Sequence, residues 1–146
     1  MLNPFDDKYF MKKALQEAEI ALAKGEVPIG AVIVCNGQII AKGHNQVETL
    51  NDPTAHAEML AFTAATNYLG AKYLPDCTLY VTLEPCQMCA GAAFWTQIGR
   101  IVYAADDEKR GYKHWHCKVH PKTEIVSGVL REESEAILQE FFKKLR

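Results

Sequence analysis

Segments with the apolar spacing of helices alternate along this chain with short apolar runs typical of strands. The first helical segment follows Asp6 and Asp7 and ends at the stop signal Lys24-Gly25. Further helices are predicted over residues 55–68, 86–97 and 131–144, and strands over residues 30–35, 38–41, 78–82, 100–104 and 123–127. This alternation predicts an α/β fold with a central sheet flanked by helices.

Two local signals indicate how these elements begin and turn. Asn36-Gly37 stands between the first two apolar runs and tolerates the positive φ angles of a tight turn, so these two strands are predicted to form a hairpin. Thr54 precedes a segment rich in Ala, Leu and Met, and it is predicted to cap that helix.

Size and composition limit the class of protein. A chain of 146 residues is long enough for one sizeable core and short for two, so residues 1–146 are predicted to form a single domain. Hydrophobic residues at 49% and charged residues at 23% disfavour disorder. The balance of 16 Lys and Arg against 18 Asp and Glu excludes nucleic-acid binding by bulk charge alone. No apolar stretch approaches the roughly 20 residues of a membrane span.

The five cysteines do not have the pattern of a disulfide framework. Their number is odd, two of them stand in a Cys-x-x-Cys pair, and no charged segment with an apolar run and a cleavage site opens the chain. We therefore expect a reduced, cytoplasmic protein. Cys35, Cys77 and Cys117 are interpreted as ordinary thiols.

Two short motifs at the start of predicted helices combine the residue types of a metal site: His56-Ala57-Glu58 and Pro85-Cys86-Gln87-Met88-Cys89. Cysteines three residues apart on a first helical turn lie on one face, and a helix N-terminus lowers the pKa of a thiol. His56, Cys86 and Cys89 are therefore candidate ligands of Zn²⁺, and three protein ligands leave the fourth tetrahedral position to water.

Glu58 is poorly placed as a further ligand, because two residues along a helix turn its side chain about 200° away from that of His56. Near the first turn, however, its long carboxylate can still reach a water molecule at the metal. We therefore predict that Glu58 carries protons during catalysis.

Each motif also has a simpler interpretation. A histidine at a helix start is more often a cap or a packing residue, and Cys-x-x-Cys can be a redox pair. The pair can also be half of a structural zinc site, completed by His44, His114, His116 or His120. The joint occurrence favours a catalytic site, because a structural site needs no neighbouring carboxylate and a redox pair needs no His56.

The sequence resembles the cytidine deaminase superfamily and, within it, the bacterial tRNA adenosine deaminases. A His-x-Glu triplet followed by Pro-Cys-x-x-Cys is the signature of zinc-dependent nucleobase deaminases. The likeness covers nearly the whole chain, through residues 27–32, 43–45, 51–58, 78–86, 88–92, 98–103 and 141–143. Residues 52–58 are shared with guanine deaminases, so this stretch is more specific for the superfamily than for the substrate.

The resemblance implies a three-layer α/β/α cytidine deaminase-like fold with a mixed five-stranded sheet, and a homodimer. It implies zinc-dependent hydrolytic deamination of adenosine to inosine at the wobble position of a tRNA anticodon loop. Asn45 matches a residue that contacts the purine, and Asp107 matches a carboxylate in the loop that meets the nucleotide backbone. The positions that line the pocket are matched by Val27, Pro28 and Ala57.

The segment of residues 105–122 departs from the family pattern. Many members carry an Asn-Leu-Leu run and a later Asn-His pair, where this chain has Lys113-His114-Trp115-His116-Cys117 in a shorter loop. Residues 109–122 contain basic and aromatic side chains and no Asp or Glu, which suits single-stranded nucleic acid, although the residues alone favour a solvated loop. Deamination of a free nucleobase such as guanine is the alternative activity, and a zinc module that uses the metal only to fold is the non-enzymatic alternative.

Overall fold

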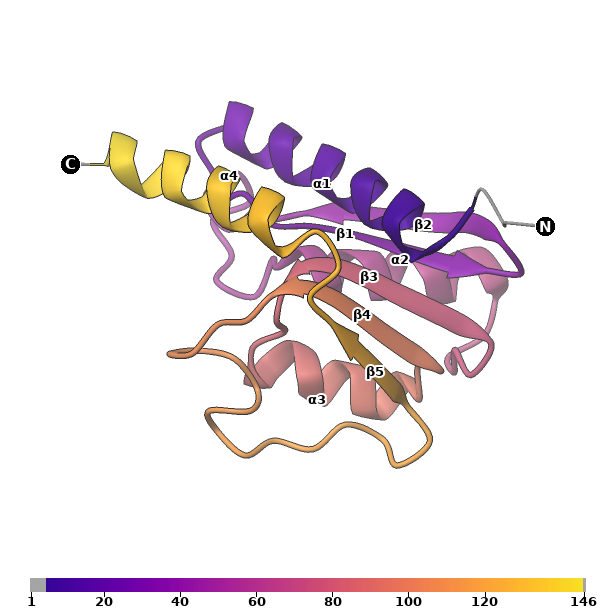
Figure 1. Cartoon of the computed structure of the whole chain (residues 1–146). Coiled ribbons are helices and arrows are strands. Elements are labelled where there is room, and N and C mark those ends of the chain that lie inside the picture. Colours follow the sequence, from indigo (N-terminus) through magenta and orange to yellow (C-terminus); the bar gives the residue numbers. More distant parts are fainter. Residues whose placement is uncertain (1–4, 146) are drawn as a thin grey trace.

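The computed structural model describes residues 5–145. Along the chain its elements are α1 (Asp7–Ala23), β1 (Gly30–Cys35), β2 (Gln38–His44), α2 (Ala57–Leu69), β3 (Cys77–Leu83), α3 (Gln87–Thr96), β4 (Arg100–Ala105), β5 (Glu124–Ser127) and α4 (Arg131–Lys144) (Figure 1). Every helix and strand predicted from the sequence is present, with small differences at the ends. The largest is in β2, which continues from residue 41 to His44.

The strands form one sheet of five in the order β2-β1-β3-β4-β5. β1 lies antiparallel to both β2 and β3, whereas β3, β4 and β5 run parallel to one another. The predicted turn joins β1 to β2, with φ angles of 52° at Asn36 and 77° at Gly37. The sheet is therefore mixed, as the resemblance implied.

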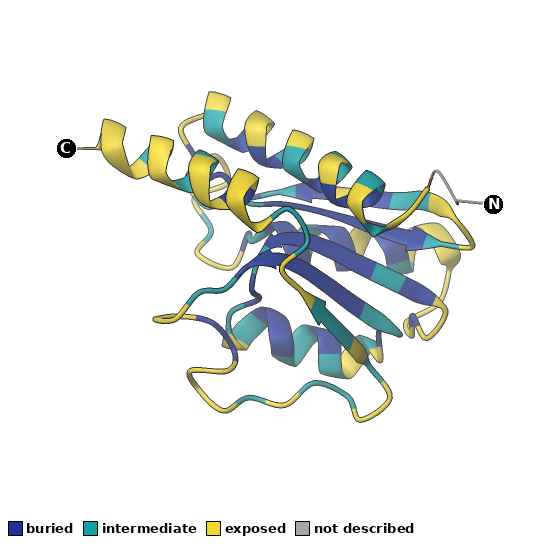
Figure 2. Ribbon diagram, in the orientation of Figure 1, coloured by how far each residue is buried: buried dark blue, intermediate teal, exposed yellow. Residues whose placement is uncertain are grey.

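Helices cover both faces of this sheet. α1 and α4 lie on one face, and α2 and α3 lie on the other (Figure 1). Each face has its own buried apolar cluster, with Met11 of α1 in one and Phe62 of α2 in the other. The inner strands β1, β3 and β4 are buried along most of their length (Figure 2). The predicted three-layer α/β/α fold is confirmed.

Two aspartates hold the N-terminal end of α1. Asp6 caps the helix, because its side chain accepts a hydrogen bond from the backbone N–H of Tyr9 at 2.9 Å. Asp7 accepts hydrogen bonds from both terminal guanidinium nitrogens of Arg100 and from the hydroxyl of Tyr80, each at 2.7 Å. These charge-assisted bonds tie α1 to β3 and β4.

Two glycines allow helices to lie directly against the sheet. A Cβ atom on Gly30 would stand 2.1 Å from the carbonyl oxygen of Ala14 in α1. A Cβ atom on Gly43 would stand 2.3 Å from the carbonyl oxygen of Ala57, the first residue of α2. Because no larger side chain fits, glycine at residue 43 sets how closely the start of α2 approaches β2.

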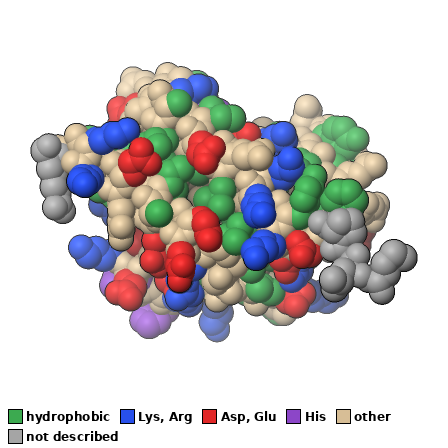
Figure 3. All heavy atoms as spheres, turned by 45° about the horizontal axis from the view of Figure 1, so that its top comes forward, with side chains coloured by type: hydrophobic (Ala, Val, Ile, Leu, Met, Phe, Trp, Pro, Cys, Tyr) green, Lys and Arg blue, Asp and Glu red, His purple; other side chains and the backbone are tan. Residues whose placement is uncertain are grey.

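The outer surface on the side of α1 and α4 carries positive and negative side chains interspersed with each other (Figure 3). This arrangement agrees with the formal net charge of −2. Within residues 5–145, no helix has the length and apolar character needed to cross a membrane.

The start of α2 corrects one prediction. Thr54 does not cap the helix: its backbone N–H and its hydroxyl both donate to Asp52 Oδ1 at 2.8 Å, and α2 begins only at Ala57. His56 occupies the N-cap position without a capping hydrogen bond from its side chain. A local turn around the Asp52 carboxylate therefore competes with capping, and the helix starts two residues later than predicted.

Candidate active site

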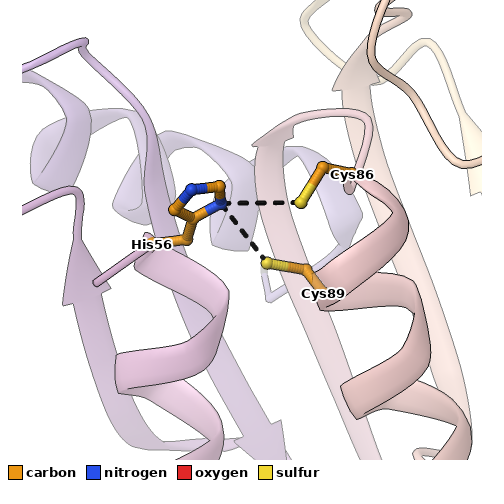
Figure 4. A group of neighbouring side chains, drawn as sticks. All are labelled: His56, Cys86 and Cys89. Atoms are coloured by element: carbon orange, nitrogen blue, oxygen red, sulfur yellow. Dashed lines mark hydrogen bonds between the residues drawn. The ribbon is translucent and has the colours of Figure 1, made fainter. Parts of the chain in front are cut away.

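The N-terminal ends of α2 and α3 are neighbours on one face of the sheet, and they bring three side chains together (Figure 4). His56 is the N-cap of α2, Cys86 is the N-cap of α3, and Cys89 lies in the first turn of α3. His56 Nδ1 lies 3.6 Å from each of the two sulfur atoms. The three predicted metal ligands therefore meet at one point, although Cys86 precedes the helical turn on which it was expected.

The spacing of these atoms suits a tetrahedral zinc ion. With bond lengths of about 2.0–2.1 Å to nitrogen and about 2.3 Å to sulfur, a tetrahedral angle places the two ligand atoms about 3.6 Å apart. The observed Nδ1–Sγ distances of 3.6 Å agree with this value. Within residues 5–145 no other His, Cys, Asp or Glu belongs to the group, so the four-ligand structural site has no support there.

The three candidate ligands differ in how readily they lose a proton. Hydrogen bonds with Cys89 and with His56 lower the pKa of the Cys86 thiol to about 4. The same contact with Cys86, together with burial, raises the pKa of Cys89, and the contact with Cys86 raises the pKa of His56. Cys86 is therefore a thiolate at neutral pH, which is the form that binds a metal ion.

Glu58 lies beside this group on the first turn of α2 and is 4% exposed. Burial is the main reason that its pKa is raised to about 7, and the nearby charge of Cys86 adds to the shift. A carboxyl group with this pKa can both accept and release a proton near neutral pH.

A cavity of about 1090 Å³ includes His56, Glu58 and Cys86 in its wall. Of the five residues expected to contact substrate, four line this cavity: Val27, Asn45, Ala57 and Asp107. Pro28 is buried and does not line it, whereas its neighbours Val27 and Ile29 do. The backbone N–H of Ile29 donates to the carbonyl oxygen of Val27 at 2.8 Å, so Pro28 lies at the centre of a γ-turn whose two ends line the cavity.

Asn45 connects two segments of the cavity wall. Its side-chain nitrogen donates to the carbonyl oxygen of Val27, and its side-chain oxygen accepts from the backbone N–H of Val47, both at 3.3 Å. Because these contacts orient the amide, Asn45 presents a defined donor and acceptor at the edge of the cavity.

Asp107 also lines the cavity, and it organises a turn. Its Oδ1 accepts hydrogen bonds from the backbone N–H groups of Lys109 at 3.3 Å and Arg110 at 3.1 Å. Both of these basic residues also line the cavity. This turn therefore contributes acidic and basic side chains to the wall of the cavity that includes the candidate metal ligands His56 and Cys86.

Two parts of the cavity wall were not predicted from the sequence. One is an apolar stripe on α4 and its C-cap residue: Leu138, Phe141, Phe142 and Leu145. Its i, i+3, i+4, i+7 spacing indicates one helix face, but spacing does not show what that face covers. The other part is a pair of buried carboxylates, Glu26 and Glu84, which are 1% and 4% exposed.

The fold and this site define a deaminase: a model of the MafB19-like deaminase family matches residues 5–146. A tRNA-specific adenosine deaminase of Aquifex aeolicus (strain VF5) is 48% identical over 144 residues, which cover 95% of this chain and 95% of that protein. The chain belongs to the family of tRNA-specific adenosine deaminases.

Two solved structures illustrate the likeness. One, from biochemical and structural studies of A-to-I editing by tRNA:A34 deaminases at the wobble position of transfer RNA, has a TM-score of 0.81 and 42% identity, and the match covers 88% of this chain and 98% of that chain. Guanine deaminase from Bacillus subtilis has a TM-score of 0.66 and 46% identity, with coverage of 72% and 66%. The resemblance seen in the sequence is therefore confirmed at the level of the family.

Proposed function

We propose that this protein is a zinc-dependent enzyme that converts adenosine to inosine at the wobble position of a tRNA anticodon. The observation that carries this proposal is the meeting of His56, Cys86 and Cys89 beside the buried Glu58, at a cavity whose wall also includes Lys109 and Arg110. Family membership supports adenosine in tRNA as the substrate.

In this mechanism His56, Cys86 and Cys89 hold the zinc ion. When bound, zinc acidifies water, so that a nucleophile is available near neutral pH. Glu58 accepts the proton of the attacking water and delivers it to N1 of the purine as the new bond forms at C6. Glu58 then takes the proton of the new C6 hydroxyl group and passes it to the amino group, so that the C6–N bond breaks, the C6 carbonyl forms and ammonia leaves. The raised pKa of Glu58, about 7, suits a group that must gain and lose a proton in each cycle.

Residues of the cavity wall would bind the nucleotide. Asn45 would hydrogen-bond the purine edge, and Val27 and Ala57 would pack against the base. Pro28 would hold the backbone that places Val27 in the cavity wall. Asp107 would meet the sugar-phosphate backbone together with the basic residues of its loop. An anticodon loop suits this arrangement because its bases are already unpaired, which avoids the cost of flipping a base from a duplex.

We also propose that the chain acts as a single domain, as a homodimer and in the cytoplasm. Large aromatic side chains on the α2 and α3 side of the sheet are strongly exposed, with Tyr68 at 67% and Trp95 at 76%. Such side chains are common where a second protein surface binds.

Deamination of free guanine is the second candidate function, and the similarity to guanine deaminase favours it. The two are separated by one experiment. The purified zinc-loaded protein is incubated with an anticodon stem-loop RNA that carries adenosine at the wobble position and, in parallel, with free guanine. We expect inosine in the RNA and no ammonia from guanine. Ammonia from guanine with unchanged RNA would overturn the proposal.

A further inference from the structure

Glu84 is a buried carboxylate for which the proposed mechanism has no use. It stands directly before Pro85 and Cys86, is 4% exposed and lines the same cavity as the metal group. A buried carboxylate is costly unless hydrogen-bond donors replace its lost hydration. The donors of Glu84 all come from one loop.

That loop wraps around the carboxylate of Glu84. The backbone N–H of Asp107 donates to Oε1 at 3.0 Å, and the backbone N–H of Lys113 donates to Oε2 at 3.2 Å. Lys113 Nζ lies 3.9 Å from Oε1. Gly111 covers the group so closely that a Cβ atom there would stand 2.1 Å from Oε2. We name residues 107–113 the rim turn.

The rim turn is also paired with the segment that carries a metal ligand. The backbone N–H of Tyr112 donates to the carbonyl oxygen of Pro85 at 2.8 Å, and Gly111 forms an isolated antiparallel bridge with Cys86. The turn contributes Asp107, Glu108, Lys109 and Arg110 to the cavity wall. The carboxylate of Glu84 therefore binds a turn that is also hydrogen-bonded to the segment of Cys86 and that contributes side chains to the cavity wall.

We propose that Glu84 is a positioning residue: it sets where the rim turn lies over the cavity and thereby how well the turn binds the RNA backbone. This inference rests on the proposed function for the identity of the ligand. The placement of the turn itself does not depend on that function. A competing role for Glu84 is to support Cys86, and the two roles predict different kinetic effects.

The first test measures backbone amide hydrogen exchange by NMR in the zinc-loaded protein without RNA. Hydrogen bonds to a charged group are stronger than neutral ones, so Glu84→Gln is expected to speed exchange at the amide of Asp107, Lys113 or both by about tenfold or more. Glu19→Gln makes the same chemical change at an exposed position of α1 and is expected to leave both amides unchanged. Unchanged exchange in a folded Glu84→Gln protein would overturn the proposal.

The second test measures kcat, KM and zinc content with anticodon stem-loop RNA. Glu84→Gln is expected to raise KM about tenfold while kcat and zinc content stay within about twofold of the wild type. A parallel fall of kcat and zinc content at constant KM would assign Glu84 to the support of Cys86 and overturn the proposal.

A second variant tests the same contact from the loop. Gly111→Ala places a Cβ atom against the carboxylate of Glu84 and the backbone carbonyl oxygen of Asp107, so it is expected to displace the turn and raise KM even if Glu84→Gln does not fold. A folded Gly111→Ala protein with unchanged KM would contradict the inference. If the wild-type protein does not deaminate RNA, the proposed function fails, while the exchange experiment still decides whether Glu84 places the turn.

Discussion

Gly43→Ala tests whether the close approach of α2 to β2 positions the metal group. The added Cβ atom would lie 2.3 Å from the carbonyl oxygen of Ala57, and real Cβ contacts essentially never fall below 3.0 Å. Relief therefore requires a shift of at least about 0.7 Å between β2 and the first turn of α2. The neighbour is backbone, so no side-chain rotation can absorb this shift.

The size of the effect follows from this geometry. Overpacking a tight contact typically costs about 1–3 kcal/mol, which lowers Tm by roughly 3–10 °C for a chain of this size. The same movement displaces His56, the residue before Ala57, relative to the two sulfurs that now lie 3.6 Å from its Nδ1. We therefore expect weaker zinc binding as well as lower stability.

The assay is thermal unfolding by circular dichroism combined with zinc titration against a chromogenic chelator. Gly91→Ala is the matched control, because Gly91 lies inside α3 and a Cβ atom there would meet nothing within 4 Å. Alanine in a helix is favoured over glycine by about 1 kcal/mol, so this control is expected to keep or raise Tm. A Gly43→Ala protein with wild-type Tm and zinc affinity would refute the reasoning.

Three further predictions concern the site and the α1 contact. Glu58→Gln is expected to lower turnover by about 10²–10⁴ with zinc retained, measured by inosine formation and metal analysis, and wild-type turnover would remove Glu58 from the mechanism. Removal of zinc by a chelator is expected to abolish deamination and lower Tm, with zinc restoring both, and full activity of the metal-free protein would be contrary to the account. The third concerns Asp7, whose pKa is lowered by its hydrogen bonds with Arg100. This contribution to stability is present above the unfolded pKa of about 3.9 and is lost as pH falls through the lower folded value. Asp7→Asn is therefore expected to lower Tm at pH 7, with a deficit that shrinks below about pH 4, and a deficit independent of pH would be inconsistent with the ion pair.

Much of the fold could be predicted because its signals are local. The hairpin turn follows from the conformational freedom of Asn36-Gly37, and the buried strands follow from short apolar runs between polar segments. The three metal ligands could be found because their spacing is set within two short motifs at helix starts. These ligands then meet in space because α2 and α3 both begin at the same end of the strands.

The contacts that depend on loops could not be predicted. Thr54 has the chemistry of a helix cap, yet its backbone N–H and hydroxyl bond to Asp52, and the helix begins only at Ala57. In the sequence Glu84 has no feature that sets it apart from other charged residues. The backbone N–H groups that bond to its carboxylate lie more than twenty residues away, in a loop without periodic sequence. Val27 and Pro28 were both expected to line the pocket, but the γ-turn of residues 27–29 places Val27 and Ile29 in the cavity wall and Pro28 away from it.

The most direct test of the central claim is a zinc K-edge X-ray absorption spectrum of the purified protein. The account predicts one zinc per chain with two sulfur neighbours at about 2.3 Å and two nitrogen or oxygen neighbours at about 2.0–2.1 Å. Cys86→Ser is expected to remove one sulfur from this shell. A shell of four sulfurs, or a protein that binds no zinc while it remains folded and active, would contradict the account.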